Sequence, residues 1–319
     1  AITIDTVVPS TATPALDLIT ADDSGSSSTD NRTNKTAYTI NATGLEPGAT
    51  VELKEGATVI ATATVSAGGT ANFSVTAATS GTHDYVVAQT DAAGNTSTTA
   101  ILLMVDVDTA VPAAPGALDL ATVSDTGSSN TDNITSDTTP TISGAPVEPG
   151  AIVTLYDSDG TTVLGTTVAD GSGNWSITPS SILSSGVHTF TTKQTDTAGN
   201  QGPASAPLAV TIVTGAPIPG TPDLTTLTDS GISSGDNLTN DPTPDFSVSG
   251  VDGNTISVFA DVNNDGVFNA GDIALGSAVV AGGVATITAA PDMLDGPYVI
   301  RATQTDLGGN VSAASSPLA

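Results

Sequence analysis

The motif Asp-x-Gly-x-x-x-x-Asp-Asn occurs three times in this chain of 319 residues. Its copies begin at Asp23, Asp125 and Asp229, and they lie 102 and 104 residues apart. A second motif, Gln-Thr-Asp-x-x-Gly-Asn, closes each copy at residues 89–95, 194–200 and 304–310. Two motifs that recur with one period indicate an array of similar folding units. The sequence therefore predicts three domains, which we place at residues 1–107, 108–214 and 215–319.

Short alternating segments predict that each domain is made of strands. Apolar and polar residues alternate over residues 152–156 and 187–194, and Gly, Pro, Asp or Asn bound these segments. In the second copy, strands are expected near residues 117–122, 139–145, 151–156, 162–168, 174–178, 187–195 and 206–213. Seven short strands in about one hundred residues are typical of an immunoglobulin-like sandwich. The expected fold is all-β, with three tandem immunoglobulin-like β-sandwich domains in an elongated head-to-tail array.

The charge of the chain excludes several kinds of partner. It has 33 Asp and Glu residues against five Lys and Arg, a formal net charge of −28. Such a chain repels phosphate backbones, so nucleic acid is not an expected partner. No apolar run approaches the roughly 18 residues of a membrane span, so we expect no direct membrane insertion. We expect the chain to be a monomer. We also expect it to be a segment of a longer protein, because Ala1 leads into residues 2–5 without a leader sequence.

The sequence offers no machinery for an enzyme. There is no Cys, and no Ser lies in a recognisable nucleophile elbow. Neighbouring acidic residues are so frequent that a pair of them is no evidence for hydrolysis. We expect His83 and His188 to be structural, and Trp175 to pack in a core rather than stack on a sugar.

The third copy contains a motif typical of a Ca²⁺-binding loop. Residues 261–272 place side-chain oxygens at positions 1, 3, 5, 9 and 12, which are Asp261, Asn263, Asp265, Asn269 and Asp272. Gly266 stands at position 6, where the chain must turn sharply, and the carbonyl of Val267 is the expected ligand at position 7. Position 12 is Asp rather than the usual Glu. The alternative is an ordinary hairpin whose Asp and Asn residues form Asx turns.

The repeated acidic loops suggest further ions at the junctions between domains. In this fold the Asp-x-Gly loop and the Thr-Asp-x-x-Gly-Asn loop lie at opposite ends of a domain, so they face each other across a junction. The expected first cluster is Asp23, Asp30 and Asn31 with Asp106, Asp108, Asp196 and Asn200. The second is Asp125, Asp132 and Asn133 with Asp306 and Asn310, and the equivalent residues of copy three are Asp229 and Asp236.

Electrostatics explains why such clusters would hold a cation. Carboxylates about 4 Å apart repel by on the order of 4 kcal/mol at an effective dielectric constant of ~20, and a divalent cation reverses the sign. Oxygen ligands without His or Cys favour Ca²⁺ over a transition metal. The alternative is that these residues are solvated and form turns at strand ends.

The motifs together resemble a known family. Residues 125–144, Glu148-Pro149-Gly150-Ala151, Gly173-Asn174-Trp175-Ser176 and residues 195–200 are similar to the bacterial Ig-like repeats of giant type I-secreted adhesins and biofilm-associated proteins. The resemblance implies an extracellular location at the bacterial cell surface, Ca²⁺ in the acidic loops, and a role as a stiff stalk. The partners it implies are neighbouring repeats, with a host glycan or protein bound by another region. A ligand-binding module within the adhesin is the alternative.

Overall fold

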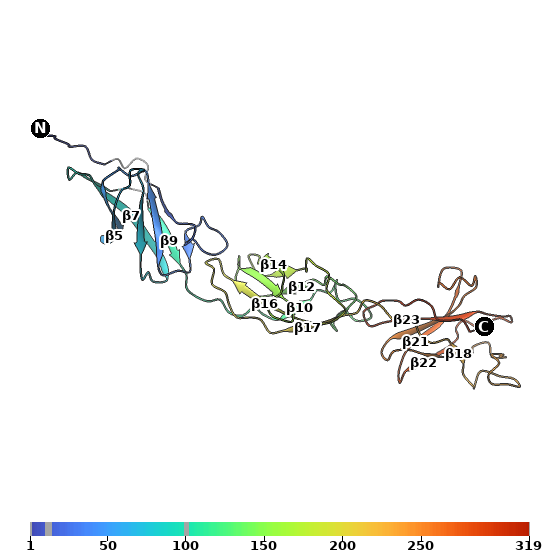
Figure 1. The fold of residues 1–319 in the computed structure, drawn as a ribbon. Helices are drawn as coiled ribbons and strands as arrows, with labels where there is room; N and C mark the ends of the chain where they lie inside the picture. The colour runs from blue at the N-terminus through green and yellow to red at the C-terminus, as the bar shows by residue number, and fades with distance from the viewer. Residues whose placement is uncertain (1, 10–14, 99–101, 319) are drawn as a thin grey trace.

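The computed structural model describes residues 2–9, 15–98 and 102–318. It is an elongated chain of three β-sandwiches with the two termini at opposite ends (Figure 1). The described residues form strands, turns and extended segments and contain no helix; accordingly, no helix suited to crossing a membrane occurs in them. The predicted all-β array of three tandem immunoglobulin-like domains is confirmed.

The first repeat packs two sheets against each other. Its strands are β1 (Ala15–Leu18), β2 (Arg32–Thr33), β3 (Tyr38–Thr43), β4 (Thr50–Glu55), β5 (Thr58–Thr64), β6 (Ala71–Val75), β7 (Gly81–Thr90), β8 (Thr96–Thr98) and β9 (Leu103–Val107). One sheet has the order β1-β3-β6, and the other has the order β2-β9-β7-β4-β5, with β8 beside β7. The short β2 runs parallel to the last strand, β9, whereas the other described pairs are antiparallel.

The second repeat has the same arrangement. Its strands are β10 (Leu118–Leu120), β11 (Ile134–Thr135), β12 (Ile142–Gly144), β13 (Ile152–Tyr156), β14 (Val163–Val168), β15 (Trp175–Ile177), β16 (Gly186–Thr195) and β17 (Leu208–Ile212). The sheets have the orders β10-β12-β15 and β11-β17-β16-β13-β14. The strand β11 pairs in parallel with β17, as β2 does with β9.

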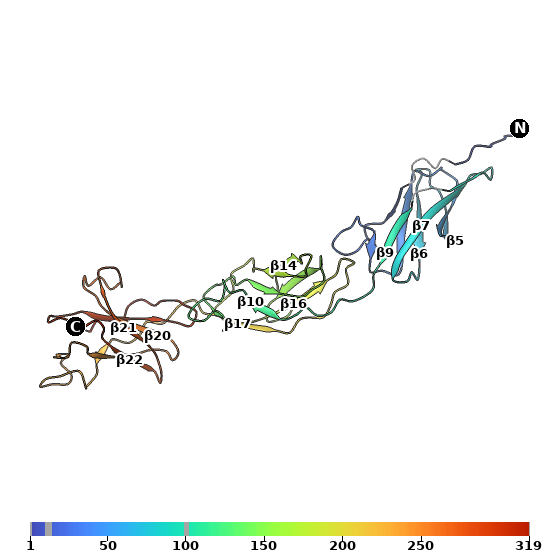
Figure 2. The same cartoon turned by 180° about the vertical axis from the view of Figure 1, so that it is seen from behind.

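The third repeat has two three-stranded sheets among its described residues. Its strands are β18 (Asp223–Leu224), β19 (Asp245–Ser249), β20 (Thr255–Ala260), β21 (Ile273–Val279), β22 (Val284–Thr288) and β23 (Ile300–Thr305). Their orders are β18-β19-β22 and β21-β20-β23. Among residues 215–318, no strand corresponds to β11, and Leu318 pairs with Ile300 as Leu208 pairs with Phe190 in repeat two. Figure 2 shows β20, β21 and β22 in this repeat.

Each core forms because apolar residues alternate along the strands. In β3 and β6 every second side chain is buried, which places one face of each strand between the sheets. Branched and small side chains dominate the three cores, as the scarcity of aromatic residues requires. Trp175 is only 6% exposed and therefore belongs to the core of repeat two, as expected.

Candidate metal-binding loops and domain junctions

The Asp-x-Gly loop of repeat one buries a carboxylate. Asp23 is 5% exposed. Asn31 adopts a left-handed backbone with φ 57°, a conformation that Asn tolerates better than most residues. Its N–H donates to Asp23 Oδ2 at 3.2 Å, and its side-chain oxygen accepts from the N–H of Leu18 at 2.9 Å. Asn31 therefore fastens the loop to β1 and holds Asp23 in place.

The second oxygen of this carboxylate has no partner. Asp23 Oδ1 is buried and makes no hydrogen bond. Burial raises the pKa of Asp23, and the nearby Asp30 carboxylate raises it further against the opposing bond from Asn31. A buried, unpartnered carboxylate oxygen beside a second carboxylate suits a hard cation such as Ca²⁺, which would take its remaining ligands from carbonyls and water. The donor set of this loop fits the ion that the sequence predicts.

The arrangement recurs in the other repeats. Asp125 and Asp229 are each 5% exposed, and each has an Oδ1 without a hydrogen-bond partner. Asn133 and Asn237 have φ angles of 59° and 57°. The pKa of Asp125 is raised by burial and by the charges of Asp132 and Asp119. Because the same Asp oxygen lacks a partner in all three repeats, the unpartnered oxygen is a property of the Asp-x-Gly motif and not of one loop.

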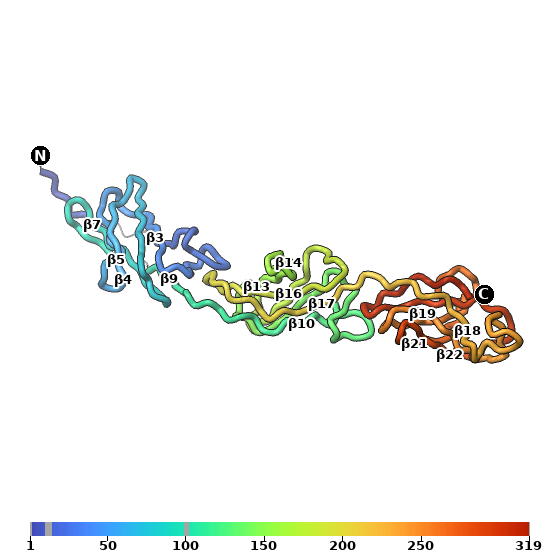
Figure 3. The backbone as a smooth tube through the Cα atoms, turned by 60° about the horizontal axis from the view of Figure 1, so that its bottom comes forward, coloured from blue at the N-terminus to red at the C-terminus, as the bar shows by residue number. Residues whose placement is uncertain are grey.

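The first junction is a direct contact between two loops. Ser24 Oγ donates to the carbonyl of Ala198 at 2.5 Å. Gly25 lies so close to repeat two that a Cβ there would be 2.0 Å from the carbonyl oxygen of Thr197. The Asp-x-Gly loop of one repeat thus meets the Thr-Asp-x-x-Gly-Asn loop of the next, and Figure 3 shows it reaching across.

Two of the predicted acidic residues at this junction, Asp106 and Asp196, already accept side-chain hydrogen bonds. Arg32 Nε donates to Asp106 Oδ2 at 2.9 Å, and its NH1 reaches Thr197 Oγ1 at 2.8 Å. Asp196 accepts bonds from Asn200 within its own loop, and the Asn200 amide also donates to the carbonyl of Asp108 at 2.8 Å. The structure brings the two predicted loops together, with Arg32 as the cation between them.

The second junction repeats the contact without the arginine. Thr126 Oγ1 donates to the carbonyl of Gly308 at 2.7 Å, and a Cβ at Gly127 would be 2.1 Å from the carbonyl oxygen of Leu307. The amide of Asn310 donates to the carbonyl of Val213 at 2.7 Å, and it also bonds to Asp306. The Gly-to-backbone contact is therefore common to both junctions.

Glu148 adds an acidic residue that the sequence reasoning did not select. Burial raises its pKa, as do the charges of Asp196 and Asp108. It stands in the Glu-Pro-Gly turn, and its N–H donates to the side chain of Gln194 at 2.8 Å. The shared Glu-Pro-Gly sequence of repeats one and two was the signal that could have identified it.

The loop of residues 261–272 connects β20 and β21 and folds around Asp265. Asp265 Oδ2 accepts from the amides of Asn263 and Asn269 at 2.8 and 3.0 Å, and its Oδ1 accepts from the N–H of Val267 at 2.8 Å. The two oxygens of Asp272 accept from the N–H groups of Val262 and Asn269. Gly266 has φ 77°, which supplies the turn expected at position 6.

Asp261 has a second role in this loop. Its buried carboxylate accepts from the N–H of Gly266 and from Arg301 Nε, at 2.9 and 2.8 Å. Burial would raise the pKa of Asp261, but these hydrogen bonds and the charge of Arg301 outweigh it, so the pKa is lowered. Arg301 already supplies a positive charge at the position where the predicted Ca²⁺ would bind. Sequence reasoning could not pair these residues, which are forty positions apart.

The predicted ligands lie in loops in which acidic side chains alternate with amides and backbone carbonyls. Within the described ranges, no group of three or more His, Cys, Asp or Glu side chains is placed to hold a metal ion. In the hairpin of repeat two, Asp159 accepts from the N–H groups of Thr161 and Thr162 and forms an ordinary turn. An ion in any of these loops would therefore depend on amide, carbonyl and water oxygens as well as carboxylates.

Comparison with known proteins gives a family match along the chain. A sequence model of the bacterial Ig-like domain matches residues 10–109, 112–214 and 216–319. No curated protein sequence matches significantly.

Three solved structures are among those to which the chain is similar. The chain is 21% identical to a tetra-tandem repeat in the extending region of a large adhesion protein, covering 96% of this chain and 75% of that one, with a TM-score of 0.27. It is 20% identical to a Ca²⁺-stabilized adhesin with which an Antarctic bacterium binds ice, covering 97% and 74%, with a TM-score of 0.37. A biofilm-associated protein domain is 14% identical, covering 88% and 62%, with a TM-score of 0.22.

Proposed function

Because this chain belongs to the bacterial Ig-like domain family, we propose that it is a calcium-rigidified segment of the extracellular stalk of a large bacterial adhesin. The observation that carries the proposal is the repeated loop contact at the two junctions, Ser24 to Ala198 and Thr126 to Gly308. A contact that recurs between successive domains favours a fixed angle from one repeat to the next. Such an array is suited to holding a distant adhesive region away from a cell surface.

Calcium is the ion that the acidic loops favour. Each repeat buries one Asp oxygen without a partner, at Asp23, Asp125 and Asp229. These loops also make the junction contacts in repeats one and two, so an ion bound there would stiffen the loop that the next repeat rests on. Without an ion, the Asp23 and Asp30 charges repel and the loop loosens.

The proposed location is extracellular, as the family resemblance implies. Calcium is plentiful there, and bound Ca²⁺ would stabilise a domain array that has no Cys for disulfide bonds. We further propose that its partners are the neighbouring repeats, that it has no catalytic role, and that adhesion to a glycan or host protein or within a biofilm is performed by another region. The domain boundaries at residues 107/108 and 214/215 are part of this proposal.

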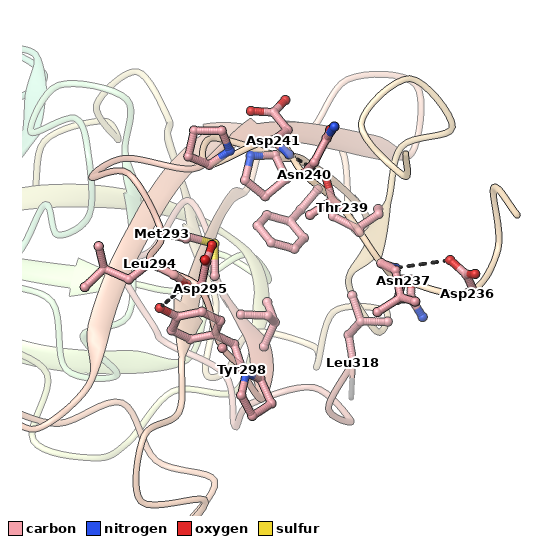
Figure 4. Close-up of a pocket in the computed structure, with 18 residues that line it drawn as sticks. Asp236, Asn237, Thr239, Asn240, Asp241, Met293, Leu294, Asp295, Tyr298 and Leu318 are labelled. Atoms are coloured by element: carbon pink, nitrogen blue, oxygen red, sulfur yellow. Dashed lines mark hydrogen bonds between the residues drawn. The ribbon is translucent and has the colours of Figure 1, made fainter. Parts of the chain in front are cut away.

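The alternative function is a ligand-binding module, and one observation favours it. The third repeat contains a cavity of about 540 Å³, lined in part by Phe246, Met293 and Tyr298. A volume of this size lies within the range of small-ligand sites. Figure 4 shows Thr239, Asn240 and Asp241 opposite Met293, Leu294 and Tyr298 around this cavity.

Thermal unfolding combined with small-angle X-ray scattering tests the stalk proposal. We expect a higher melting temperature in Ca²⁺ than in chelator or in equal Mg²⁺, since an ion at ~100 times its dissociation constant adds about 2.7 kcal/mol per site. We also expect a single extended shape on the order of 110 Å long in Ca²⁺, and a broader distribution of shapes in chelator. Equal melting temperatures and scattering curves in all three conditions would remove calcium from the proposal.

A further inference from the structure

The two junctions share one backbone frame. The N–H of Asp106 donates to the carbonyl of Asn31 at 3.0 Å in repeat one, and the N–H of Thr211 donates to the carbonyl of Asn133 at 2.9 Å in repeat two. The short parallel pairs β2–β9 and β11–β17 therefore place the same backbone positions at the end of each repeat. Figure 3 shows loops of successive repeats meeting at both junctions. Because the frames agree, side chains at equivalent positions can be compared directly.

At the first junction these positions carry charges. Asp106 holds Arg32 of its own repeat at 2.9 Å, and Arg32 Nη1 donates to Thr197 Oγ1 of repeat two at 2.8 Å. Asp108 lies at the same junction, where its carbonyl accepts from the Asn200 amide. The pairing of β2 with β9 sets Arg32 beside Asp106, so repeat one itself orients the guanidinium toward the next repeat.

The facing turn of repeat two adds a further acid. The N–H of Glu148 donates to the side chain of Gln194, which fixes the turn. Burial raises the pKa of Glu148, and the charges of Asp196 and Asp108 raise it further, so these carboxylates lie near one another. Four acids and one arginine thus gather at this junction. We call them the charged set: Arg32, Asp106, Asp108, Glu148 and Asp196.

The end of repeat two is uncharged at the same positions. Ile134 in β11 stands where β2 has Arg32, and its pairing partner Thr211 stands where β9 has Asp106. Both members of the ion pair are replaced, so no single charge is left without its partner at this position.

The linker differs in the same direction. The carbonyl of Val213 accepts from the Asn310 amide at 2.7 Å, as the carbonyl of Asp108 accepts from the Asn200 amide at 2.8 Å. Val213 therefore replaces Asp108. It also lies against the next repeat, because a Cβ on Gly308 would be 3.3 Å from Val213 Cβ.

The facing surface of repeat three is apolar where that of repeat two is polar. The N–H of Val251 donates to the side chain of the motif Gln at 2.9 Å, as that of Glu148 does at 2.8 Å, so the two residues are equivalent. Leu307 stands at the position of Thr197 in the Thr-Asp-x-x-Gly-Asn motif. Its methyl groups lie 3.9 Å from the Cβ position of Gly253, in the turn that contains Val251. We call four residues the apolar set: Ile134, Val213, Val251 and Leu307.

The junctions also differ in the space that they leave. Ala198 is 0% exposed at the first junction, and its equivalent at the second is Gly308. A Cβ on Gly308 would lie 3.2 Å from the carbonyl carbon of Thr135 and 3.3 Å from the nitrogen of Ser136, which is tighter than ordinary contact. The loop of repeat two, which carries Ala198, therefore fits the end of repeat one better than the end of repeat two.

We propose that the two junctions are matched pairs of unlike chemistry, so that each repeat docks on its own successor and not on another repeat. The charged set joins repeat one to repeat two, and the apolar set joins repeat two to repeat three. This inference rests on the proposed stalk, in which successive repeats keep a fixed angle, and adds which surface fits which. A charged end against an apolar loop would leave the guanidinium partly desolvated without an acceptor, which disfavours the wrong pairing.

Distances between spin labels measure each junction separately, and a chain without Cys is suited to them. Thr62, Thr166 and Ser277 are exposed and occupy the same position of β5, β14 and β21. Thr62→Cys with Thr166→Cys reports the first junction, and Thr166→Cys with Ser277→Cys reports the second. Each full-length sample is measured in chelator and in Ca²⁺. A difference between these conditions tests the calcium proposal, whereas differences among variants within one condition test the matching.

Loss of the arginine should loosen the first junction in a way that salt reverses. Arg32→Gln leaves the four acids of the charged set without their cation, so the distance distribution should broaden at the first junction and not at the second. About 1 M NaCl, where the Debye length is about 3 Å, should restore the narrow distribution. Lys54→Gln is the matched control, because Lys54 lies in β4 and pairs with Glu52. Broadening that salt does not reverse, or equal broadening by both variants, would overturn the role of the charged set.

Transplanted residues test the matching itself. Ile134→Arg places a charged end opposite the apolar loop and should broaden the second junction at low and high salt. Adding Thr211→Asp, Val251→Glu and Leu307→Thr gives this junction the residues of the first, and should narrow the distribution again. Val251 and Leu307 are 50% and 37% exposed, so these changes leave the core intact. If the quadruple variant is no narrower than Ile134→Arg, or if Ile134→Arg changes nothing, backbone contacts alone set the angle and the proposal is wrong.

Discussion

The N–H of Asn31 donates to Oδ2 of Asp23 at 3.2 Å, while Oδ1 of the same carboxylate is buried without a partner. The left-handed backbone of Asn31 fixes this arrangement, and the corresponding Asn residues of repeats two and three have the same conformation. An unpartnered buried oxygen costs free energy, typically about 1–3 kcal/mol. The motif retains this cost in all three repeats, and a bound cation would offset it.

Asp23→Asn should have opposite effects with and without calcium. Burial raises the pKa of Asp23, so the charged form destabilises the folded state at neutral pH, and this destabilisation disappears as the pH falls through the raised pKa. The neutral amide removes it, and we expect a higher melting temperature of repeat one in chelator at neutral pH. In Ca²⁺ the variant should lose much of the stabilisation that the wild type gains. Calorimetry in chelator and in Ca²⁺ measures the melting temperatures, and the variant should melt above the wild type in chelator and below it in Ca²⁺.

The control for that variant is Asp84→Asn. Asp84 is an exposed residue of β7, so the substitution makes the same change in charge away from the loop. It should leave the calcium-dependent gain unaltered. If Asp23→Asn behaves like Asp84→Asn in both conditions, the Asp-x-Gly loop binds no ion.

Gly25→Ala should disrupt the first junction. The new Cβ would lie 2.0 Å from the carbonyl oxygen of Thr197, and backbone atoms cannot be moved aside cheaply. Repeats one and two should therefore reorient, which residual dipolar couplings or scattering of a dilute sample would detect. Gly231→Ala is the matched control, because Gly231 also has positive φ, 118° against 95°, but no neighbour. Both variants should lose about 1 kcal/mol or more from local strain, and only Gly25→Ala should change the interdomain angle.

The strands and the junction topology could be predicted because they depend on local patterns. In repeat two, all seven expected strands occur, since alternation and turn residues determine them. The two-residue strand β11 was not predicted, because its pairing partner β17 lies more than seventy residues away and two residues carry no period. For the same reason the pairs Arg32–Asp106 and Arg301–Asp261 were not predicted. Each follows from tertiary contacts that no local spacing encodes.

Asp261→Ala with Asp265→Ala should affect repeat three alone. The pair removes the acceptors for the N–H groups of Gly266 and Val267, so the hairpin loop should become mobile while both junctions stay intact. If the loop binds Ca²⁺, titration calorimetry should show one ion fewer. An unchanged stoichiometry would establish that residues 261–272 form a hairpin without an ion.

Arg301→Gln separates the two roles of Asp261. Arg301 Nε donates to Asp261 Oδ2 at 2.8 Å. Its positive charge therefore lies beside the carboxylate that would bind the predicted Ca²⁺. Without its charge, the Ca²⁺ affinity of the loop should rise, while in chelator repeat three should melt at a lower temperature, because Asp261 is left buried and uncompensated. Lower affinity in the variant would indicate that Arg301 supports the loop rather than competes with calcium.

Because of His83, repeat one should lose stability as the pH rises above 6.5. Its Nδ1 lies 2.8 Å from Glu55 Oε1, and its Nε2 lies 2.8 Å from the carbonyl of Thr79. Burial lowers the pKa of His83, but the Thr79 carbonyl and the Glu55 carboxylate outweigh it, and the pKa is raised above 6.5. The stabilisation is thus complete below pH 6.5 and is lost as the pH rises through the folded pKa. An NMR titration of His83 with melting at about pH 6 and about pH 8.5 measures it, and Glu55→Gln should lower the pKa and reduce the difference in melting temperature.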